Sequence, residues 1–295
     1  MRDKLATVMA TFNGAKFIEQ QVYSIFAQDY DGDMKLFVHD DGSTDRTLDI
    51  LKKLSEKFPI ELVLPNEKLG VQKGFLKSLE TIMTYEPDYI FLADQDDVWN
   101  ENKVQLQIDS VENKENPTMV FTNYDLIDEN GRTIKKNAGP KLNTGLVETS
   151  MYNLLFNPIV TGNNVMMTGS FLMELAKNEL LNANKISMHD HLISLHALET
   201  GNLFYLNVVT VQYRQHSHNV VGAGRQSIWK RFSKKSKSWI NLSNSLEMIP
   251  LFRSVEPLSN KNFFSKIHWL VKHRISKNSF VNTLGSYFYI LFLWQ

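Results

Sequence analysis

The feature of this sequence that most constrains the fold is a regular alternation of short apolar runs with longer amphipathic segments, over residues 5–111. Each apolar run has the length of a buried strand, roughly four to eight residues, and each amphipathic segment repeats its apolar positions at helical spacing. This alternation predicts βαβ units and a mainly parallel sheet with helices on both faces. The predicted strands are residues 5–11, 34–39, 60–64 and 89–93, and the predicted helices are residues 16–28, 44–58, 71–85 and 98–111. Beyond this alternation, residues 161–168 are predicted to form a further strand.

Polar clusters follow three of these predicted strands at the point where each strand ends. The carboxyl ends of parallel strands meet at one edge of a sheet, and ligands bind beyond that edge. We therefore expect the three clusters to form one site. They are Thr11-Phe12-Asn13-Gly14, Asp40-Asp41-Gly42-Ser43 and Asp94-Gln95-Asp96-Asp97.

Composition narrows the class of protein. Lys and Arg number 32, as do Asp and Glu, so no overall field attracts nucleic acid. The absence of cysteine excludes disulfides, thiolate catalysis and Cys-type zinc sites, and it suits a reducing cytoplasm. The first residues lack the apolar core of a signal peptide, and no window holds the roughly 18 apolar residues of a membrane span. We therefore expect a cytoplasmic protein.

The adjacent carboxylates Asp40 and Asp41 indicate a bound ligand. Ser43 or Thr44 can cap the helix that follows, and Gly42 is an ordinary turn residue. Capping does not explain two neighbouring carboxylates, because they repel each other unless a partner is present. Ribose hydroxyls and a base N–H are donors that such carboxylates can accept from, so the pair predicts nucleoside binding.

The cluster after the strand at residues 89–93 predicts a cation site. Asp97 is interpreted as the cap of the helix at residues 98–111, which leaves Asp94 and Asp96 without a structural explanation. Mg²⁺ and Mn²⁺ take oxygen ligands, usually one or two carboxylates together with substrate phosphates. The pair therefore predicts Mg²⁺ or Mn²⁺ as cofactor.

Other enzymes of this fold class lack support in the sequence. A dinucleotide-binding turn needs three spaced glycines after the first strand, and here Gly14 stands alone. A P-loop is also missing, and a phosphatase would need an aspartate nucleophile where Asn13 stands. A non-catalytic carbohydrate-binding module stays open as an alternative, although it would not need three polar clusters at one edge.

Three segments together resemble the successive signatures of family 2 inverting glycosyltransferases with the GT-A fold, over residues 1–224. They are Ala10-Thr11-Phe12-Asn13-Gly14, residues 40–45, and residues 92–99. The form Asp-Gln-Asp-Asp-Val-Trp is similar to that of bacterial rhamnosyltransferases that build surface polysaccharides. The downstream segments Tyr213-Arg214-Gln215-His216 and Asn219-Val220-Val221-Gly222 share this similarity. The resemblance implies an α/β fold of GT-A type, with a Rossmann-like, mixed but mainly parallel sheet.

The resemblance also implies roles on the donor side of the site. The nucleoside would be held by Thr11, Phe12, Asn13, Asp40 and Asp41, with Asp94 nearer the ribose. Asp96 would bind the metal on the diphosphate. His216 would complete the metal or diphosphate site, since neutral imidazole is a competent ligand, and Arg214 would contact a phosphate.

On the acceptor side, Asp190 lies where the family places its catalytic base, at the start of a predicted helix at residues 189–199. A carboxylate there can take the proton of an acceptor hydroxyl. The alternatives are a helix cap or zinc binding by the flanking histidines. Histidines two positions apart do not share a helix face, which disfavours zinc. His189, Asn163 and Asn164 are assigned to the acceptor cleft. Relatives often carry a Trp shortly after this motif, and Leu192-Ile193 stand here instead.

These observations predict a catalytic domain at residues 1–224 and a helical C-terminal appendage at residues 225–295. The predicted reaction is inverting transfer of a sugar, with L-rhamnose from dTDP-L-rhamnose as the first choice, to a glycan or lipid-linked glycan acceptor in cell-surface polysaccharide synthesis. A UDP-hexose or UDP-furanose donor is the alternative. The appendage is basic with interspersed aromatic residues over positions 225–239, which suits either the inner face of the cell membrane or a second subunit of a homodimer.

Overall fold

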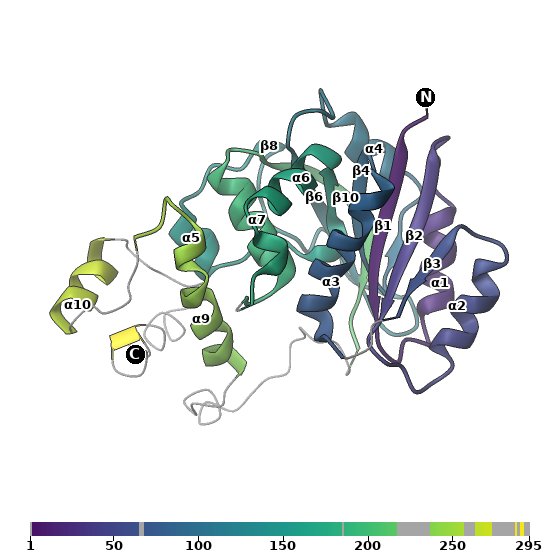
Figure 1. Cartoon of the computed structure of the whole chain (residues 1–295), viewed down its shortest axis with the longest axis horizontal. Coiled ribbons are helices and arrows are strands. Elements are labelled where there is room, and N and C mark those ends of the chain that lie inside the picture. Colours follow the sequence, from purple (N-terminus) through teal and green to yellow (C-terminus); the bar gives the residue numbers. More distant parts are fainter. Residues whose placement is uncertain are drawn as a thin grey trace.

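One mixed sheet forms the centre of the protein (Figure 1). The structure is a computed structural model that describes residues 2–64, 68–184, 186–216, 237–256 and 263–272, together with Tyr287, Ile290 and Leu291. Within these residues, ten strands pair in the order β3-β2-β1-β4-β9-β6-β10-β5, with β7 on β6 and β8 on β10. The strands are β1 (Lys4–Thr11), β2 (Asp33–Asp40), β3 (Ile60–Val63), β4 (Tyr89–Asp94), β5 (Val98–Trp99), β6 (Met119–Ile127), β7 (Thr133–Lys135), β8 (Gly145–Leu146), β9 (Val165–Thr168) and β10 (Leu203–Arg214).

The direction of the strands confirms a mixed, mainly parallel sheet. Strands β3, β2, β1 and β4 are mutually parallel, and β6 and β10 are parallel to each other. Strand β9 lies between β4 and β6 and is antiparallel to both, which joins the two parallel sets in one sheet. The carboxyl ends of β1, β2, β4, β6 and β10 therefore lie at the same edge.

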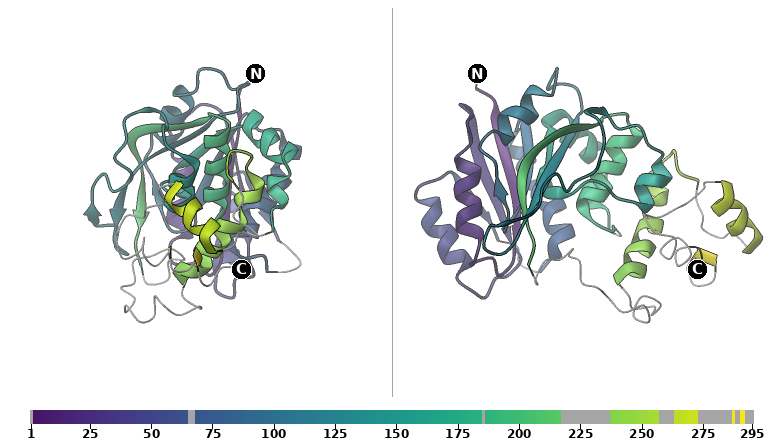
Figure 2. Two further views of the ribbon diagram at one scale, coloured as in Figure 1. Left: turned by 90° about the vertical axis from the view of Figure 1, so that its left-hand side faces the viewer. Right: turned by 180° about the vertical axis from the view of Figure 1, so that it is seen from behind.

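Helices cover both faces of the sheet (Figure 2). Apolar residues of α1 (Ile18–Phe26), α2 (Thr47–Ser55) and α4 (Lys103–Asp109) share one buried cluster with one face of the sheet. A second, larger cluster joins the opposite face to α3 (Gly70–Thr81), α5 (Met151–Phe156), α6 (Gly169–Lys177) and α7 (His189–Glu199). The apolar run of β1 serves both clusters because successive side chains of a strand point to opposite faces: Val8 packs with the second cluster and Met9 with the first.

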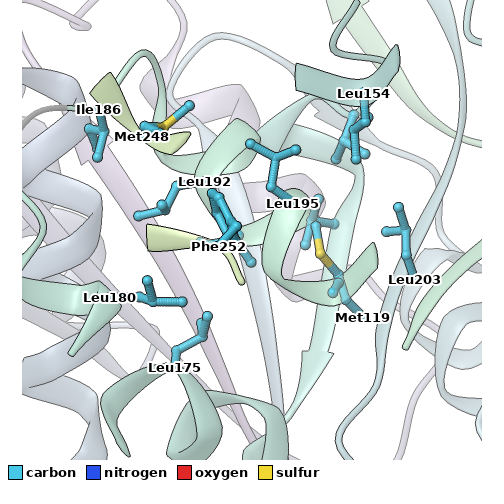
Figure 3. Close-up of a cluster of buried hydrophobic side chains, with 14 of the residues drawn as sticks. Met119, Leu154, Leu175, Leu180, Ile186, Leu192, Leu195, Leu203, Met248 and Phe252 are labelled. Carbon is cyan, nitrogen blue, oxygen red and sulfur yellow. The ribbon is translucent and has the colours of Figure 1, made fainter. Parts of the chain in front are cut away.

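The C-terminal segments pack onto the same core. Helix α9 (Lys237–Glu247) and the short turn η4 (Ile249–Leu251) lead to α10 (Phe263–Lys272). Figure 3 shows Met248 and Phe252 among side chains that include Leu192 and Leu195 of α7, and all four are buried. The described part of the predicted appendage therefore shares the hydrophobic core of the preceding residues. The predicted boundary at residue 224 and the basic residues 225–236 lie outside the described residues.

Two predicted segments differ from the structure. The helix predicted at residues 98–111 is wrong at its start: Val98 and Trp99 form β5, which pairs antiparallel with β10, and α4 begins at Lys103. Asp97 is therefore not a helix cap. The strand predicted at residues 161–168 begins as a 3₁₀ turn, η2 (Gly162–Asn164), before β9. In both places a long-range contact decides the conformation, which local periodicity does not reveal.

Candidate active site

The three polar clusters meet at the carboxyl edge of the sheet. In the register of the parallel strands, Thr11 lies opposite Asp40, and Ala10 lies opposite Asp94. Adjacent strands are about 4.8 Å apart, so the three loops that follow them are in contact. The predicted convergence of the clusters is thus a property of the sheet itself.

Hydrogen bonds to Gln95 fix the end of β1. The Thr11 hydroxyl donates to Gln95 Oε1 over 2.6 Å, and the Phe12 N–H donates to the same atom over 3.0 Å. The Gln95 amide returns a bond to the Phe12 carbonyl oxygen over 3.2 Å. Gly14 leaves room for this side chain, because a Cβ there would lie 2.2 Å from Gln95 Oε1. Gln95 thereby ties the first cluster to the third.

Asn13 joins the first cluster to the second. Its backbone has a φ of 51°, in the left-handed region that Asn tolerates better than most residues. Its N–H donates to Ser43 Oγ over 2.9 Å, and its Oδ1 accepts from the Thr44 N–H over 2.8 Å. These contacts shape the loop, and Asn13 does not line the cavity described below. Its predicted contact with the nucleoside is replaced in the structure by loop contacts.

The two adjacent aspartates are placed differently. Asp40 is buried, and its oxygens accept from the Gly42 N–H, the Ser43 N–H and the Ser43 hydroxyl. Its carboxylate therefore stabilises the turn, which was not foreseen. Asp41 lines the cavity, and its Oδ1 accepts from the N–H groups of Leu69 and Gly70 at the start of α3. Of the two, Asp41 lines the cavity and Asp40 does not.

A cavity of about 480 Å³ begins at this edge and runs toward α7 and α9. Its near wall contains Thr11, Phe12, Asp41 and residues 94–96. Its far wall comes from the loop after α5, from Thr161 and Gly162, from the start of α7, and from Leu242 and Ser245 of α9. One enclosed space therefore joins the predicted donor residues to Asp190.

Several carboxyl groups lie near the place where these walls meet. Burial raises the pKa of Asp94 to about 8, and the charges of Asp96 and Asp190 add to this shift. Burial, with the charges of Asp94 and Asp96, also raises the pKa of the Asp97 carboxyl well above its usual range. Four carboxyl groups thus lie close enough to interact electrostatically, and a bound cation would relieve the repulsion between them.

Asp96 and His216 are brought together as predicted metal ligands. Asp96 Oδ2 lies 2.6 Å from His216 Nε2, although the two residues are 120 positions apart. Among the residues that the structure describes, no group of three or more His, Asp or Glu side chains is arranged to hold a metal ion. Two protein ligands with an open side nonetheless fit Mg²⁺ or Mn²⁺, which complete their coordination with waters and substrate phosphates. Cis ligands of such an ion lie about 3 Å apart, so the two atoms need to separate by only a few tenths of an ångström.

Arg214 has a structural part that differs from the predicted phosphate contact. Its side chain is buried and does not line the cavity. Its Nε donates to the Asp96 carbonyl oxygen over 2.7 Å, and Nη2 donates to Gln20 Oε1 over 2.8 Å. Nη1 donates to the carbonyl oxygens of Asp128 and Glu129. The guanidinium therefore holds the Asp96 loop against the β6–β7 hairpin.

Asn163 and Asn164 also differ from their predicted roles at the acceptor cleft. Both are buried and neither lines the cavity. Asn163 Nδ2 donates to Asp97 Oδ2 over 2.5 Å, and Asn164 Nδ2 donates to the Thr122 carbonyl oxygen over 2.6 Å. Asp97 Oδ1 in turn accepts from the Arg214 N–H over 2.8 Å. Asp97 thus connects the third cluster to η2 and to the end of β10.

Asp190 lies in the first turn of α7, at the start of a helix as predicted. Its Oδ2 accepts from the Gly162 N–H over 3.0 Å, and its Oδ1 accepts from the His191 N–H over 2.8 Å. Asp190 lines the cavity, so it can present a carboxylate oxygen to a bound hydroxyl.

The neighbouring His189 is buried, stacks on Phe75 with ring centroids 3.9 Å apart, and lines the cavity. Neither of its ring nitrogens has a hydrogen-bond partner within the described residues. Burial lowers the pKa of the imidazole, so it is neutral near pH 7. A neutral ring with free polar atoms beside Asp190 suits contact with a sugar hydroxyl.

Sequence reasoning missed several residues that line the cavity. His39 precedes the Asp40-Asp41 pair, Tyr213 precedes Arg214, and Phe75 lies on α3. Burial and the charges of Asp94, Asp97 and Asp96 raise the pKa of Tyr213, which keeps its hydroxyl protonated. The signal for His39 and Tyr213 was their position at strand ends next to residues already singled out.

Comparison with known proteins agrees with this geometry. The family model of glycosyl transferase family 2 matches residues 7–175, which is more than half of the 295 residues. The chain therefore belongs to glycosyl transferase family 2. It is 29% identical, over 240 residues, to the dTDP-rhamnosyl transferase RfbG of Shigella flexneri; the match covers 78% of this chain and 80% of that protein.

Solved structures confirm the GT-A-like fold. TarS 1–349 of S. aureus in complex with UDP-GlcNAc superposes with a TM-score of 0.59 at 15% identity, over 98% of this chain and 81% of TarS 1–349. The complex with UDP gives the same TM-score at 16% identity, over 83% and 65% of the two chains. The mannosyltransferase PcManGT from Pyrobaculum calidifontis, solved with GDP-Man and Mn²⁺, has a TM-score of 0.51 at 15% identity, over 98% and 70%.

Proposed function

We propose that this family 2 glycosyltransferase moves a sugar from a pyrimidine nucleoside diphosphate donor to an acceptor hydroxyl, with inversion at the anomeric carbon. The observation that carries the proposal is the single cavity that joins Asp41, Asp94 and Asp96 on one side to Asp190 on the other. Single displacement needs a base on the face of the sugar opposite the leaving diphosphate. Donor-side and acceptor-side carboxylates in one enclosed space meet that need.

Each part of the chain then has a defined task. Asp41 and Thr11 bind the nucleoside, and Asp94 faces the ribose. Asp96 and His216 would hold Mg²⁺ or Mn²⁺, which supplies positive charge to the departing diphosphate when bound. Asp190 accepts the proton of the attacking hydroxyl while His189 orients the acceptor sugar. The wall formed by α9 limits access of water to the cavity.

The preferred donor is dTDP-L-rhamnose, since the chain is similar to a dTDP-rhamnosyl transferase over four fifths of that protein's length. For a β-linked donor, inversion gives an α-L-rhamnoside. The acceptor would be a glycan or lipid-linked glycan of a bacterial cell-surface polysaccharide such as capsule or cell wall. A UDP-hexose or UDP-furanose is the second donor class, because uracil and thymine present the same hydrogen-bonding edge.

A donor screen tests this proposal. The chain would be incubated with dTDP-L-rhamnose, UDP-glucose, UDP-N-acetylglucosamine and UDP-galactofuranose, each with Mn²⁺ or with excess chelator. We expect one donor to raise the unfolding temperature and to release nucleoside diphosphate, in both cases only with the metal. Failure of every donor to bind in the presence of Mn²⁺ would contradict the proposal.

We also propose that α10 contributes to attachment at the inner face of the cell membrane. Phe264 is 80% exposed and Ile267 is 37% exposed, one turn apart on this helix. Apolar side chains beside basic ones suit an anionic lipid interface. Among the described residues, no helix is long and apolar enough to cross a bilayer. A second subunit of a homodimer is the alternative partner for this surface.

Vesicle flotation separates these partners. The full chain should float with phosphatidylglycerol-containing vesicles, and the double variant Phe264→Ser and Ile267→Ser should float several-fold less. Met173→Ser is the matched control, since Met173 is also an exposed apolar residue, at 57%, on α6. A full chain that does not float but sediments as a dimer would favour the subunit contact.

A further inference from the structure

The mechanism above gives no task to the buried imidazole of His39, which lines the cavity. His39, near the end of β2, is 1% exposed, and neither of its ring nitrogens has a hydrogen-bond partner in the described structure. A buried polar group without a partner is uncommon in a folded protein and calls for an explanation. His39 lines the cavity, so a ligand can supply the missing partner.

Helix α3 passes close to the imidazole and fixes its place. A Cβ at position 74 would lie 3.0 Å from His39 Cδ2 and 3.2 Å from Nε2, so Gly74 provides the space that the ring occupies. A larger residue in α3 would push the ring out of this place. The ring therefore lies directly against the backbone of α3, which limits its movement on that side.

The strand register shows which part of a nucleotide-sugar donor His39 can contact. His39 and Asp94 both lie opposite Ala10, on either side of β1, and partners in a parallel sheet direct their side chains to the same face. Two strand spacings place His39 about 10 Å from Asp94, on the side away from Asp96 and His216. With the diphosphate at Asp96 and the ribose at Asp94, the nucleobase lies toward His39 and Asp41.

The hydrogen-bonding groups of His39 and Asp41 indicate which nucleobase they can bind. Burial lowers the pKa of His39, against the opposing effect of Asp41 and Asp40, so the ring is neutral at pH 7 and offers one donor and one acceptor. Asp41 offers a carboxylate acceptor beside it. Uracil and thymine carry an N3–H donor flanked by two carbonyl acceptors, which matches one carboxylate and one N–H donor. Cytosine has no hydrogen on N3 and therefore lacks the donor that Asp41 would accept.

We propose that His39 is a base-recognition residue, which donates a hydrogen bond to the O4 carbonyl oxygen of uracil or thymine, where cytosine carries an amino group, while Asp41 accepts from N3–H. This inference rests on the proposed function, since it assumes a pyrimidine nucleotide donor. His39 then selects uracil or thymine over cytosine from its place in the cavity wall, next to Gly74 of α3.

The test is a set of dissociation constants for UDP, dTDP and CDP, measured by calorimetry with Mn²⁺ present. His39→Phe keeps an aromatic ring but removes both nitrogens, and it should weaken UDP and dTDP by about tenfold while CDP changes little. His39→Gln restores a donor and an acceptor and should recover part of the loss. The control is His196→Phe: His196 is also buried, with its Nε2 3.5 Å from Glu174 Oε1, but it lies outside the cavity.

The outcomes separate the inference from the function on which it rests. Wild-type affinity of His39→Phe for UDP and dTDP would overturn the role of His39 and leave the proposed function intact. An equal loss for all three nucleotides, or the same loss in His196→Phe, would also overturn it, because the effect would then be general rather than base-specific. If the wild-type chain binds none of the three, the donor assignment and this inference both fail.

Discussion

Replacement of Asp97 by Ala is the perturbation for which the structure gives the clearest magnitude. The Asp97 carboxyl is fully buried and accepts hydrogen bonds from Asn163 Nδ2 and from the Arg214 N–H. Its removal takes the carboxylate acceptor away from both buried donors, at a cost of about 1–3 kcal/mol each. The pKa of Asp97 is raised by burial, so loss of a destabilised charge offsets part of this cost. We expect the free energy of unfolding to fall by about 2–4 kcal/mol.

Asp97→Asn is the matched comparison. In this variant, Oδ1 of the new Asn side chain can still accept from the Arg214 N–H. If the Asn163 amide rotates, the new amide can donate to Asn163 Oδ1, which has no partner in the described structure. We expect a loss of only about 1 kcal/mol. Urea denaturation at pH 7, with the slope of each transition compared, measures both values. The reasoning is refuted if the Ala variant lies within about 0.5 kcal/mol of wild type, or if Asn is as damaging as Ala.

Three further outcomes are expected. Asp96→Asn should retain the fold and lose turnover, and full activity of this variant in excess chelator would end the metal proposal. Gly162→Ala should lower kcat at least about tenfold with little change in donor affinity, because a Cβ there would lie 2.8 Å from His189 Nε2. An unchanged kcat would contradict close packing around His189 on the acceptor side of the cavity. Burial lowers the pKa of Lys103 to about 7 from its usual 10.5, so the unfolded chain binds more protons between these values. The free energy of unfolding should therefore rise by about 2 kcal/mol from pH 7 to pH 9 relative to Lys103→Met, as measured by urea denaturation. The same pH dependence of this free energy in both proteins would contradict the effect of burial on Lys103.

The position of the donor side of the cavity could be predicted from the sequence, because the residues that follow neighbouring parallel strands lie at the same edge of the sheet. The clusters at residues 11–14, 40–43 and 94–97 meet wherever β1, β2 and β4 are neighbours. Helix periodicity likewise placed Asp190 in the first turn of α7. These features depend on local pattern and on sheet geometry alone, which is why they transfer from sequence to structure.

The direction of individual side chains could not be predicted in the same way. Asn163 turns away from the cavity because Asp97 accepts from its amide, and these two residues are 66 positions apart. Arg214 is drawn to carbonyl oxygens of a hairpin 86 positions earlier in the chain. β5 forms because β10 lies beside it. Each outcome depends on a long-range contact, and no local motif encodes it.

The most direct test of the account is the rate of sugar transfer by Asp190→Asn beside its affinity for the donor. Asp190 lines the same cavity as Asp41, Asp94 and Asp96 and is held by the N–H groups of Gly162 and His191. Asn keeps the shape and removes the basic oxygen. Transfer should fall by about 10²–10⁴-fold, while the dissociation constant of the donor with Mn²⁺ stays close to the wild-type value. Transfer at the wild-type rate would contradict Asp190 as the base, and a collapse of donor affinity would contradict the division of the cavity into donor and acceptor sides.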